Sequence, residues 1–163
     1  MPRGTEIEMT HFLYGTRIGK FGQLAVGCNA IIFDRSRQKV LLTRRADNGW
    51  WCLPGGIMEA GESVTEACLR EVREETGPSV RIIQLVGVYS DPHRITEYSN
   101  GNKYQFVSLS FDAEPFEGEL GTSEETTDCR YFSLAEIEKM QVLEPHREQI
   151  ADALANRLTA CVH

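Results

Sequence analysis

Carboxylates are concentrated in one stretch of the sequence, from Gly55 to Gly77. Glu71, Glu74 and Glu75 have i, i+3, i+4 spacing, which places their side chains on one face of a helix. Their charges repel one another, and they lie in the second half of that helix, where the macrodipole disfavours negative charge. A hard divalent cation accounts for such an arrangement, because Mg²⁺ binds carboxylate oxygens together with water and substrate phosphates. The pattern predicts a metal site, and a solvated acidic helix face is the alternative.

The residues around these glutamates predict the helix that carries them. Ser63 and Glu66 have the spacing of a capping box, so the helix should begin at about Val64. Gly77 fits the position after the last turn, and Pro78 cannot continue the helix. The expected helix has about 13 residues.

A helical wheel assigns the other faces of this helix. Leu69 and Val72 are expected to point toward the core, and Glu66 is placed to pair with Arg70 one turn later. The loop before the helix contains Pro54-Gly55-Gly56, in which main-chain groups can approach a ligand closely.

The rest of the chain predicts an α/β (α+β) fold, in which a mixed β-sheet is sandwiched between α-helices. The first two strands should form a hairpin, and 114–128 should be an acidic loop of about 15 residues, a length that is often functional. Strands are expected at 24–33, 39–45, 80–89, 104–111 and 129–132, and later helices at about 134 and at 145–158.

Composition indicates one domain over residues 1–163, with 1–20 as an N-terminal extension. Apolar residues make up 41% and charged residues 25%, as in ordinary globular proteins. The net charge of -7 argues against a nucleic-acid partner. No apolar run suits a membrane span, and the N-terminus lacks the apolar region of a signal peptide. Five scattered cysteines predict reduced thiols and a cytoplasmic location.

The stretch 56–78 resembles the signature of the Nudix (MutT-like) hydrolases. That signature is Gly, five residues, Glu, seven residues, then Arg-Glu-apolar-x-Glu-Glu-x-Gly-apolar, and Gly56, Glu62 and the run from Arg70 to Gly77 match it. Pro78 departs from the aliphatic residue that is usual there. The segments RRADNGWWCLPGG and YFSLAEIEKM are also similar to this family, and the bacterial ADP-ribose pyrophosphatase-like branch is the most similar.

The resemblance implies a Nudix fold and an enzyme that cleaves a nucleoside diphosphate linked to another group. It implies Mg²⁺ as the cofactor, with Mn²⁺ as a substitute. Glu74 and Glu75 correspond to the principal metal ligands, Glu71 to a further ligand or the base, and the Gly55 carbonyl to a ligand from the loop. A homodimer is common in the resembling branch.

The resemblance leaves the catalytic base open. Some members use the glutamate at the position of Glu71, whereas ADP-ribose pyrophosphatases use a glutamate on a late loop. Glu124 and Glu125 are the candidates there, and a solvated acidic loop is the alternative. Arg70 would orient a neighbouring glutamate, and Glu62 would be structural or a supporting acid.

Substrate-binding residues must lie partly outside this signature. Arg44 or Arg45 could hold a phosphate bidentately, with a surface pair as the alternative. One of Trp50 and Trp51, taken as Trp51, is expected to face a base. Gly56 is expected to approach the substrate closely.

A few other residues have less definite roles. For Tyr89, Tyr98 and Tyr104 we prefer packing to base stacking. The segment Asp91–Arg94 is an alternative substrate contact, and His146 has no neighbour in sequence that suggests a role.

The working hypothesis is Mg²⁺-dependent hydrolysis of a small nucleoside diphosphate derivative, ADP-ribose or a related sugar nucleotide first. An alternative is cleavage of a (d)NTP to (d)NMP and pyrophosphate. A non-catalytic nucleotide-binding module is disfavoured because all the signature glutamates are present. An RNA 5′-end hydrolase is disfavoured by the acidic charge and by the lack of a basic stripe.

Overall fold

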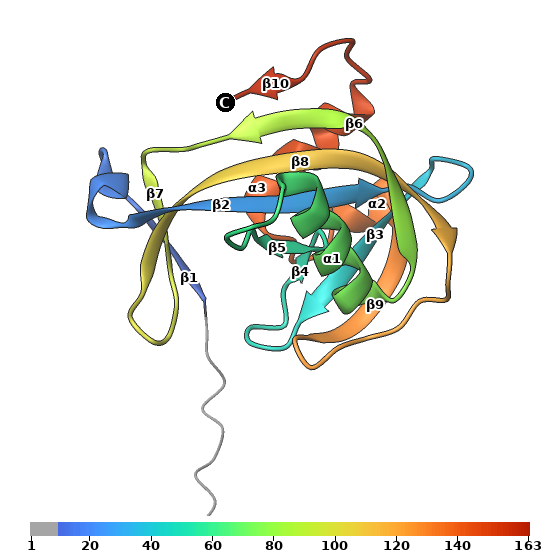
Figure 1. The fold of residues 1–163 in the computed structure, drawn as a ribbon, viewed down its shortest axis with the longest axis horizontal. Coiled ribbons are helices and arrows are strands. Elements are labelled where there is room, and N and C mark those ends of the chain that lie inside the picture. Colours follow the sequence, from blue (N-terminus) through green and yellow to red (C-terminus); the bar gives the residue numbers. More distant parts are fainter. Residues whose placement is uncertain (1–9) are drawn as a thin grey trace, which may run out of the picture.

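The computed structural model describes residues 10–163, which form two β-sheets with helices packed against them (Figure 1). Residues 1–9 of the N-terminal extension predicted at 1–20 lie outside the described part. The strands are β1 (His11–Tyr14), β2 (Gln23–Ile32), β3 (Lys39–Arg45), β4 (Trp51–Cys52), β5 (Gly55–Ile57), β6 (Ser79–Tyr89), β7 (Arg94–Glu97), β8 (Lys103–Glu117), β9 (Thr126–Ser133) and β10 (Cys161–Val162). The helices are the 3-10 turn η1 (Ile18–Phe21), α1 (Val64–Thr76), α2 (Leu134–Ile137) and α3 (Glu144–Leu154).

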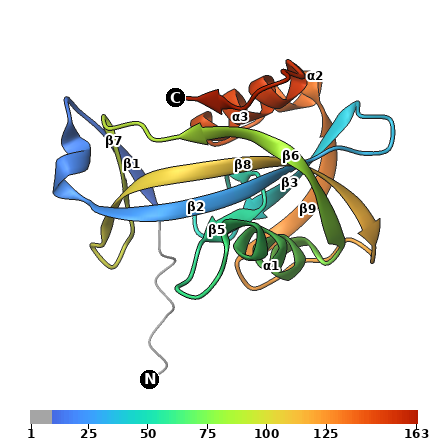
Figure 2. The ribbon, with the colours of Figure 1, turned by 45° about the horizontal axis from the view of Figure 1, so that its top comes forward.

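The larger sheet is mixed and has the strand order β1-β7-β8-β2-β5, with β6 also paired to β8 and β10 to β6. Strand β2 runs parallel to β8 and antiparallel to β5. The smaller sheet has the order β4-β3-β9. Helices α1 and α3 lie on opposite sides of the larger sheet (Figure 2). The expected mixed sheet between helices is therefore confirmed.

The second half of strand β2, from Gly27 to Ile32, is the centre of the core because both of its faces are buried. Residues on one face, such as Ala30 and Ile32, pack with Cys68 and Val72 of α1. Ile31 on the other face packs in a second cluster that includes side chains of α3. Burial on both faces explains why the strand reads as a continuous apolar run rather than an alternating one.

The expected hairpin of the first two strands is wrong. Strands β2 and β3 lie in different sheets, and only Phe33 and Val40 form a bridge between these segments. The physical reason is that β5 and β8 already occupy the two hydrogen-bonding edges of β2. Strand β3 instead pairs with β4 and β9.

The later loops are shorter than expected. Strand β7 lies inside the segment expected to be a loop before β8. Because β8 continues to Glu117 and β9 begins at Thr126, the expected acidic loop contracts to 118–125. Helix α3 ends at Leu154, and Asn156 then takes a positive φ of 48°, so Leu158 is exposed outside the helix.

Helix α1 matches its expected bounds, with both capping-box hydrogen bonds of Ser63 formed and Gly77 at φ 94°. The assignment of Leu69 to the core is wrong, because that side chain is 37% exposed while Ala67 and Cys68 are buried. The expected Glu66 pair with Arg70 is also replaced, since the Glu66 carboxylate accepts from the Ser63 backbone N–H.

All five cysteines are free and buried. Among residues 10–163, no helix has the length and apolar character needed to cross a membrane.

Candidate active site

Two glycines bring strand β5 against both β2 and α1. Gly55 lies opposite Asn29 and Gly56 opposite Cys28 in the antiparallel pair. A Cβ atom at Gly55 would lie 2.1 Å from the Cys28 carbonyl oxygen, and one at Gly56 would lie 2.4 Å from the Glu71 carboxyl carbon. The absence of side chains therefore permits the close approach that places the strand beside the acidic helix.

Glu75 also points into this junction from α1. Its Oε2 accepts a hydrogen bond from the Gly55 backbone N–H at 3.0 Å. Burial raises the pKa of Glu75 to about 8, and although the Gly55 hydrogen bond opposes this, the charges of Glu71 and Glu125 add to it. Arg45 acts in the opposite direction, but burial dominates, so the Glu75 carboxyl group holds its proton more tightly than a free glutamate does.

Arg70 connects the loop before α1 to the acidic face of the helix. Its Nε donates to Glu62 Oε1 at 2.6 Å, and its Nη1 donates to Glu71 Oε1 at 2.7 Å. The hydrogen bond from Arg70 lowers the pKa of Glu62 to about 2. The pKa of Glu71 is nevertheless raised, because burial outweighs the contribution of Arg70.

Glu74 is the most exposed of these acids, with 60% of its side chain accessible, and it lies 3.4 Å from Arg70 Nη1. Within residues 10–163, the donor atoms of Glu71, Glu74 and Glu75 do not form a group that lies within 4.8 Å of one another. Glu71 is directed to Arg70 and Glu75 to the Gly55 N–H. Side-chain rotation would therefore have to accompany metal binding.

The chemistry of these residues fits a hard divalent cation. Carboxylate and carbonyl oxygens are the donors that Mg²⁺ takes. The pKa values of Glu71 and Glu75 are raised because ionising a buried carboxyl group is unfavourable, and a bound cation would offset that cost.

A cleft of about 650 Å³ opens beside this junction. It brings together six of the residues singled out from the sequence: Arg45, Gly55, Gly56, Glu75, Glu124 and Glu125. Glu71 lies against Gly56, at the edge of the cleft. Glu75 and the glycine loop thus share one cavity with the Arg45 guanidinium and the late-loop glutamates, whereas Glu74 is not part of its lining.

Two predicted substrate contacts lie elsewhere. The exposed Arg44 donates from Nε to the Gly49 carbonyl at 3.1 Å, outside the cleft lining. Trp51 packs edge-on against Phe132 with 4.8 Å between ring centroids, within the cluster under α3. Successive side chains of a strand point to opposite faces, which explains both positions. Arg45, next to Arg44, and Cys52, next to Trp51, are the residues that line the cleft.

A NUDIX domain family model matches residues 23–154. The chain belongs to the Nudix family. An ADP-ribose pyrophosphatase of Methanocaldococcus jannaschii is 34% identical over 119 residues, which cover 71% of this chain and 66% of that relative. The chain therefore spans slightly less than two thirds of that protein. A nucleoside triphosphatase, NudI, of Escherichia coli is 34% identical over 96 residues, covering 54% of this chain and 68% of the relative.

Solved structures have the same fold. A Nudix hydrolase of Nitrosomonas europaea superposes with a TM-score of 0.68 at 27% identity, covering 82% of this chain and 90% of that chain. The stretch 56–78, which resembles the Nudix signature (the Nudix box), lies within the residues that the family model matches.

The Nudix cleft also contains residues that the sequence did not assign. Asp47 binds Arg45 at 2.7 Å and accepts a hydrogen bond from Thr10 Oγ1 at 2.9 Å. Arg94, which was an alternative contact, lines the cleft, and so does Tyr98, for which packing was preferred. The proximity of Asp47 to Arg45 in sequence is a signal that could have indicated this ion pair.

His146 is a cleft residue for which the sequence offered no signal. Its Nδ1 accepts a hydrogen bond from the Leu53 backbone N–H at 2.9 Å, so Nε2 carries the proton. Burial lowers the pKa of His146 to about 3, and Arg45 and Arg94 contribute in the same direction. The ring is therefore neutral at physiological pH and holds the chain just before the glycine loop.

Proposed function

We propose that this Nudix protein is a Mg²⁺-dependent hydrolase that cleaves the pyrophosphate linkage of a nucleoside diphosphate derivative, with ADP-ribose or a related sugar nucleotide favoured. The observation that carries the proposal is the cleft in which the partly buried Glu75 lies beside arginine and aromatic side chains. Such a cavity combines groups that bind phosphate with a carboxyl group whose pKa is raised by burial.

The residues proposed to hold the metal are Glu71, Glu74 and Glu75, together with the Gly55 carbonyl. When bound, Mg²⁺ would neutralise developing charge on the phosphates and activate water. Mn²⁺, which accepts similar oxygen donors, is the proposed substitute. Arg70, which does not line the cleft, would hold Glu71 in place through its hydrogen bond.

The proposed reaction is attack of water on one phosphorus of the pyrophosphate. A bond forms between the water oxygen and that phosphorus, and the bond from the phosphorus to the bridging oxygen breaks. The bridging oxygen leaves as part of the second phosphate, and a glutamate takes the proton of the water. With ADP-ribose the products are AMP and ribose 5-phosphate.

Glu125 is our preferred base. Its backbone carbonyl accepts from the Ala46 N–H at 3.0 Å, which anchors this part of the loop beside β3. Its charge contributes to the raised pKa of both Glu71 and Glu75, so it lies close to both. Glu124 lines the same cleft without such an influence on the box acids.

The lining of the cleft supports a nucleotide substrate. Arg94 lies with its guanidinium 5.7 Å from the centroid of the Phe12 ring, so a cation and an aromatic face are presented together. Arg45 is already paired with Asp47, which leaves Arg94 as the proposed main phosphate contact. Tyr98 and Phe106, also in the lining, provide the proposed stacking surface for a base.

A second candidate is hydrolysis of a (d)NTP to (d)NMP and pyrophosphate. The observation that favours it is the 34% identity to the nucleoside triphosphatase NudI of Escherichia coli. A substrate panel with product analysis separates the candidates. AMP and ribose 5-phosphate from ADP-ribose support the first, and pyrophosphate from a (d)NTP supports the second.

The decisive test of catalysis uses Glu74→Gln and Glu75→Gln beside wild type, each assayed with Mg²⁺. We expect both substitutions to reduce turnover by roughly a hundredfold or more if the carboxylates hold the metal. Wild-type turnover in both variants would overturn the metal assignment. Absence of turnover on the whole panel, with nucleotide binding retained, would favour a non-catalytic binding module.

A further inference from the structure

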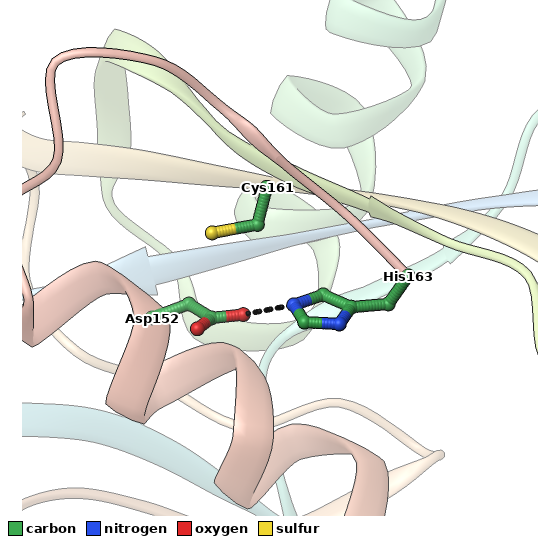
Figure 3. A group of neighbouring side chains, drawn as sticks. All are labelled: Asp152, Cys161 and His163. Carbon is green, nitrogen blue, oxygen red and sulfur yellow. Dashed lines mark hydrogen bonds and ion pairs between the residues drawn. The ribbon is translucent and has the colours of Figure 1, made fainter.

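A second group of metal-ligating side chains lies away from the Nudix cleft. Within residues 10–163, Asp152, Cys161 and His163 form the one group of three or more such residues whose donor atoms all lie within 4.8 Å of one another. Figure 3 shows the three side chains directed into the same small space between α3 and the C-terminal strand. None of them lines the cleft described above.

Two regular elements bring these donors together. Cys161 and His163 are two residues apart, at and just after β10, so their side chains lie on the same side of the extended chain. Asp152 lies on α3, one turn after Glu148. Strand β10 is held beside β6 by the pairing of Cys161 with Gly87 and of Val162 with Val88. The fold therefore presents two donors from a strand to a helix face.

The surrounding contacts orient the donors. Asp152 Oδ2 accepts from the Tyr89 hydroxyl at 2.8 Å and lies 3.1 Å from His163 Nε2. The other ring nitrogen of His163, Nδ1, lies 3.6 Å from Glu148 Oε1. The Tyr89 ring stacks on the His163 ring with 5.3 Å between centroids and 14° between planes. The Asp152 carboxylate and the His163 ring thus each have a neighbour that orients them for a metal.

We propose that Asp152, Cys161 and His163 bind one Zn²⁺ ion, which ties the C-terminal strand to α3. Thiolate, imidazole and carboxylate are the donors that Zn²⁺ combines, whereas Mg²⁺ takes oxygen donors. His163 binds through Nε2, and its Nδ1–H donates to Glu148. The thiolate and the carboxylate together balance the charge of the ion, and water completes the tetrahedron.

The distances fit this ion. Zinc bonds of about 2.0–2.1 Å to nitrogen and oxygen at tetrahedral angles place those donors about 3.3 Å apart. The Asp152 oxygen and the His163 nitrogen are already 3.1 Å apart. At a Zn–S bond of about 2.3 Å the sulfur would lie about 3.5 Å from the other two donors, so it has to approach them by about 1.3 Å at most, given the 4.8 Å limit on the group. Binding then releases the thiol proton to solvent.

The site has a structural consequence for the cleft. Helix α3 carries Asp152, and its residues Pro145 and Gln149 line the cleft. Gln149 Oε1 accepts from Asn29 Nδ2 of β2 at 2.8 Å, in a fully buried contact. An ion that fixes β10 to α3 therefore stabilises the helix that forms one wall of the cleft, without contacting substrate.

The test is a Co²⁺ titration of the full-length protein, freed of metal and kept reduced with a phosphine. Bound cobalt gives a thiolate-to-metal absorption band only if a cysteine is a ligand, so cobalt in the Nudix box does not contribute. We expect a band that saturates at one Co²⁺ per chain and is abolished by added Zn²⁺. Absence of the band in the wild type would overturn the proposal.

Variants then assign the ligands. Cys161→Ser is expected to abolish the band, while the matched control Cys129→Ser keeps it; each of these cysteines is 8% exposed. Glu74→Gln is expected to keep it as well. A band that survives Cys161→Ser would overturn the proposal.

Circular dichroism shows whether Cys161→Ser folds, and a second variant tests the site if it does not. His163→Gln changes a side chain that is 43% exposed, so it should leave the fold intact. We expect it to weaken Co²⁺ binding at least tenfold, and Glu148→Gln to weaken it about tenfold through the lost imidazole contact. Unchanged affinity in His163→Gln would leave only an Asp–His hydrogen bond at this place, and the proposal would fail.

Discussion

Arg70 donates a hydrogen bond from Nε to Glu62 Oε1 at 2.6 Å, and this contact joins the loop before α1 to the second turn of the helix. The same guanidinium donates from Nη1 to Glu71 Oε1 at 2.7 Å. One planar side chain therefore fixes the position of a box glutamate relative to the glycine loop.

Replacing Arg70 with Lys should reduce turnover by roughly tenfold to a hundredfold, because an ammonium group cannot reproduce the planar fork and Glu71 would be misplaced. The free energy of unfolding should change by less than about 1 kcal/mol, since these ion pairs are partly exposed. Steady-state kinetics over a range of Mg²⁺ concentrations and urea unfolding measure the two effects. A variant with wild-type turnover would show that the positioning role is wrong.

Gly56→Ala and Gly55→Ala should separate activity from stability. A Cβ at Gly56 meets the movable Glu71 carboxylate, at 2.4 Å from its carbon, so turnover should fall roughly a hundredfold while the fold persists. A Cβ at Gly55 meets backbone, at 2.1 Å from the Cys28 carbonyl oxygen, so the free energy of unfolding should fall by about 3 kcal/mol or more. Thermal unfolding and kinetics on both variants measure this.

The control for this pair is Gly121→Ala. Nothing lies within 4 Å of a Cβ at Gly121, so neither turnover nor stability should change. Equal effects of Gly55→Ala and Gly56→Ala on stability would contradict the assigned contacts.

Glu75 should make the metal-free protein less stable at alkaline pH. Burial, the largest cause, raises its pKa from 4.5 to about 8 in the folded state. The folded protein thus holds the proton more tightly than the unfolded chain, and the associated stability is complete below pH 4.5 and is lost as the pH rises through about 8.

Glu75→Gln should remove that dependence. In EDTA, the free energy of unfolding of the variant minus that of wild type should be more positive at pH 9 than at pH 5, as measured by urea unfolding. The same difference at both pH values would contradict a raised pKa at this position.

His146 should make the protein less stable in acid. Burial lowers its pKa from 6.5 to about 3 in the folded state, so the unfolded chain takes up a proton first. The associated stability is complete above pH 6.5 and is lost as the pH falls toward about 3. His146→Asn, whose side-chain oxygen can accept from the Leu53 N–H, should lose about 2 kcal/mol less than wild type between pH 7 and pH 5. Urea unfolding at the two pH values tests this, and parallel losses would refute it.

Glu125→Gln should reduce turnover by roughly a hundredfold to ten-thousandfold and remove the acidic limb of the pH–rate profile, as expected for loss of a general base. The matched change Glu124→Gln, on the adjacent residue of the same loop, should stay within about threefold of wild type if Glu125 is the base. The opposite ranking would assign the base to Glu124, and no effect of either would return the role to Glu71.

Local patterns in the sequence determined helix α1. The capping box at Ser63 and the glycine at Gly77 act within one turn of the helix ends, so the bounds of Val64–Thr76 were predicted without knowledge of the fold. The spacing of the box glutamates followed from the same periodicity. The family was likewise indicated by eight fixed positions of the signature, because residue types and their spacing can be compared without knowing the fold.

Tertiary structure decided which strands pair and what the cleft contains. The hairpin prediction failed because strand β2 pairs with a segment far along the chain. Gln23 of β2 lies opposite Tyr104 of β8, whereas β3, the next strand in sequence, pairs with β9 in the other sheet. Arg45, Arg94 and His146 come from three separate segments, and only the folded chain brings them to one cavity. Sequence periodicity records which face of an element is apolar, whereas pairing and convergence depend on non-local burial, and for that reason the substrate contacts required the structure.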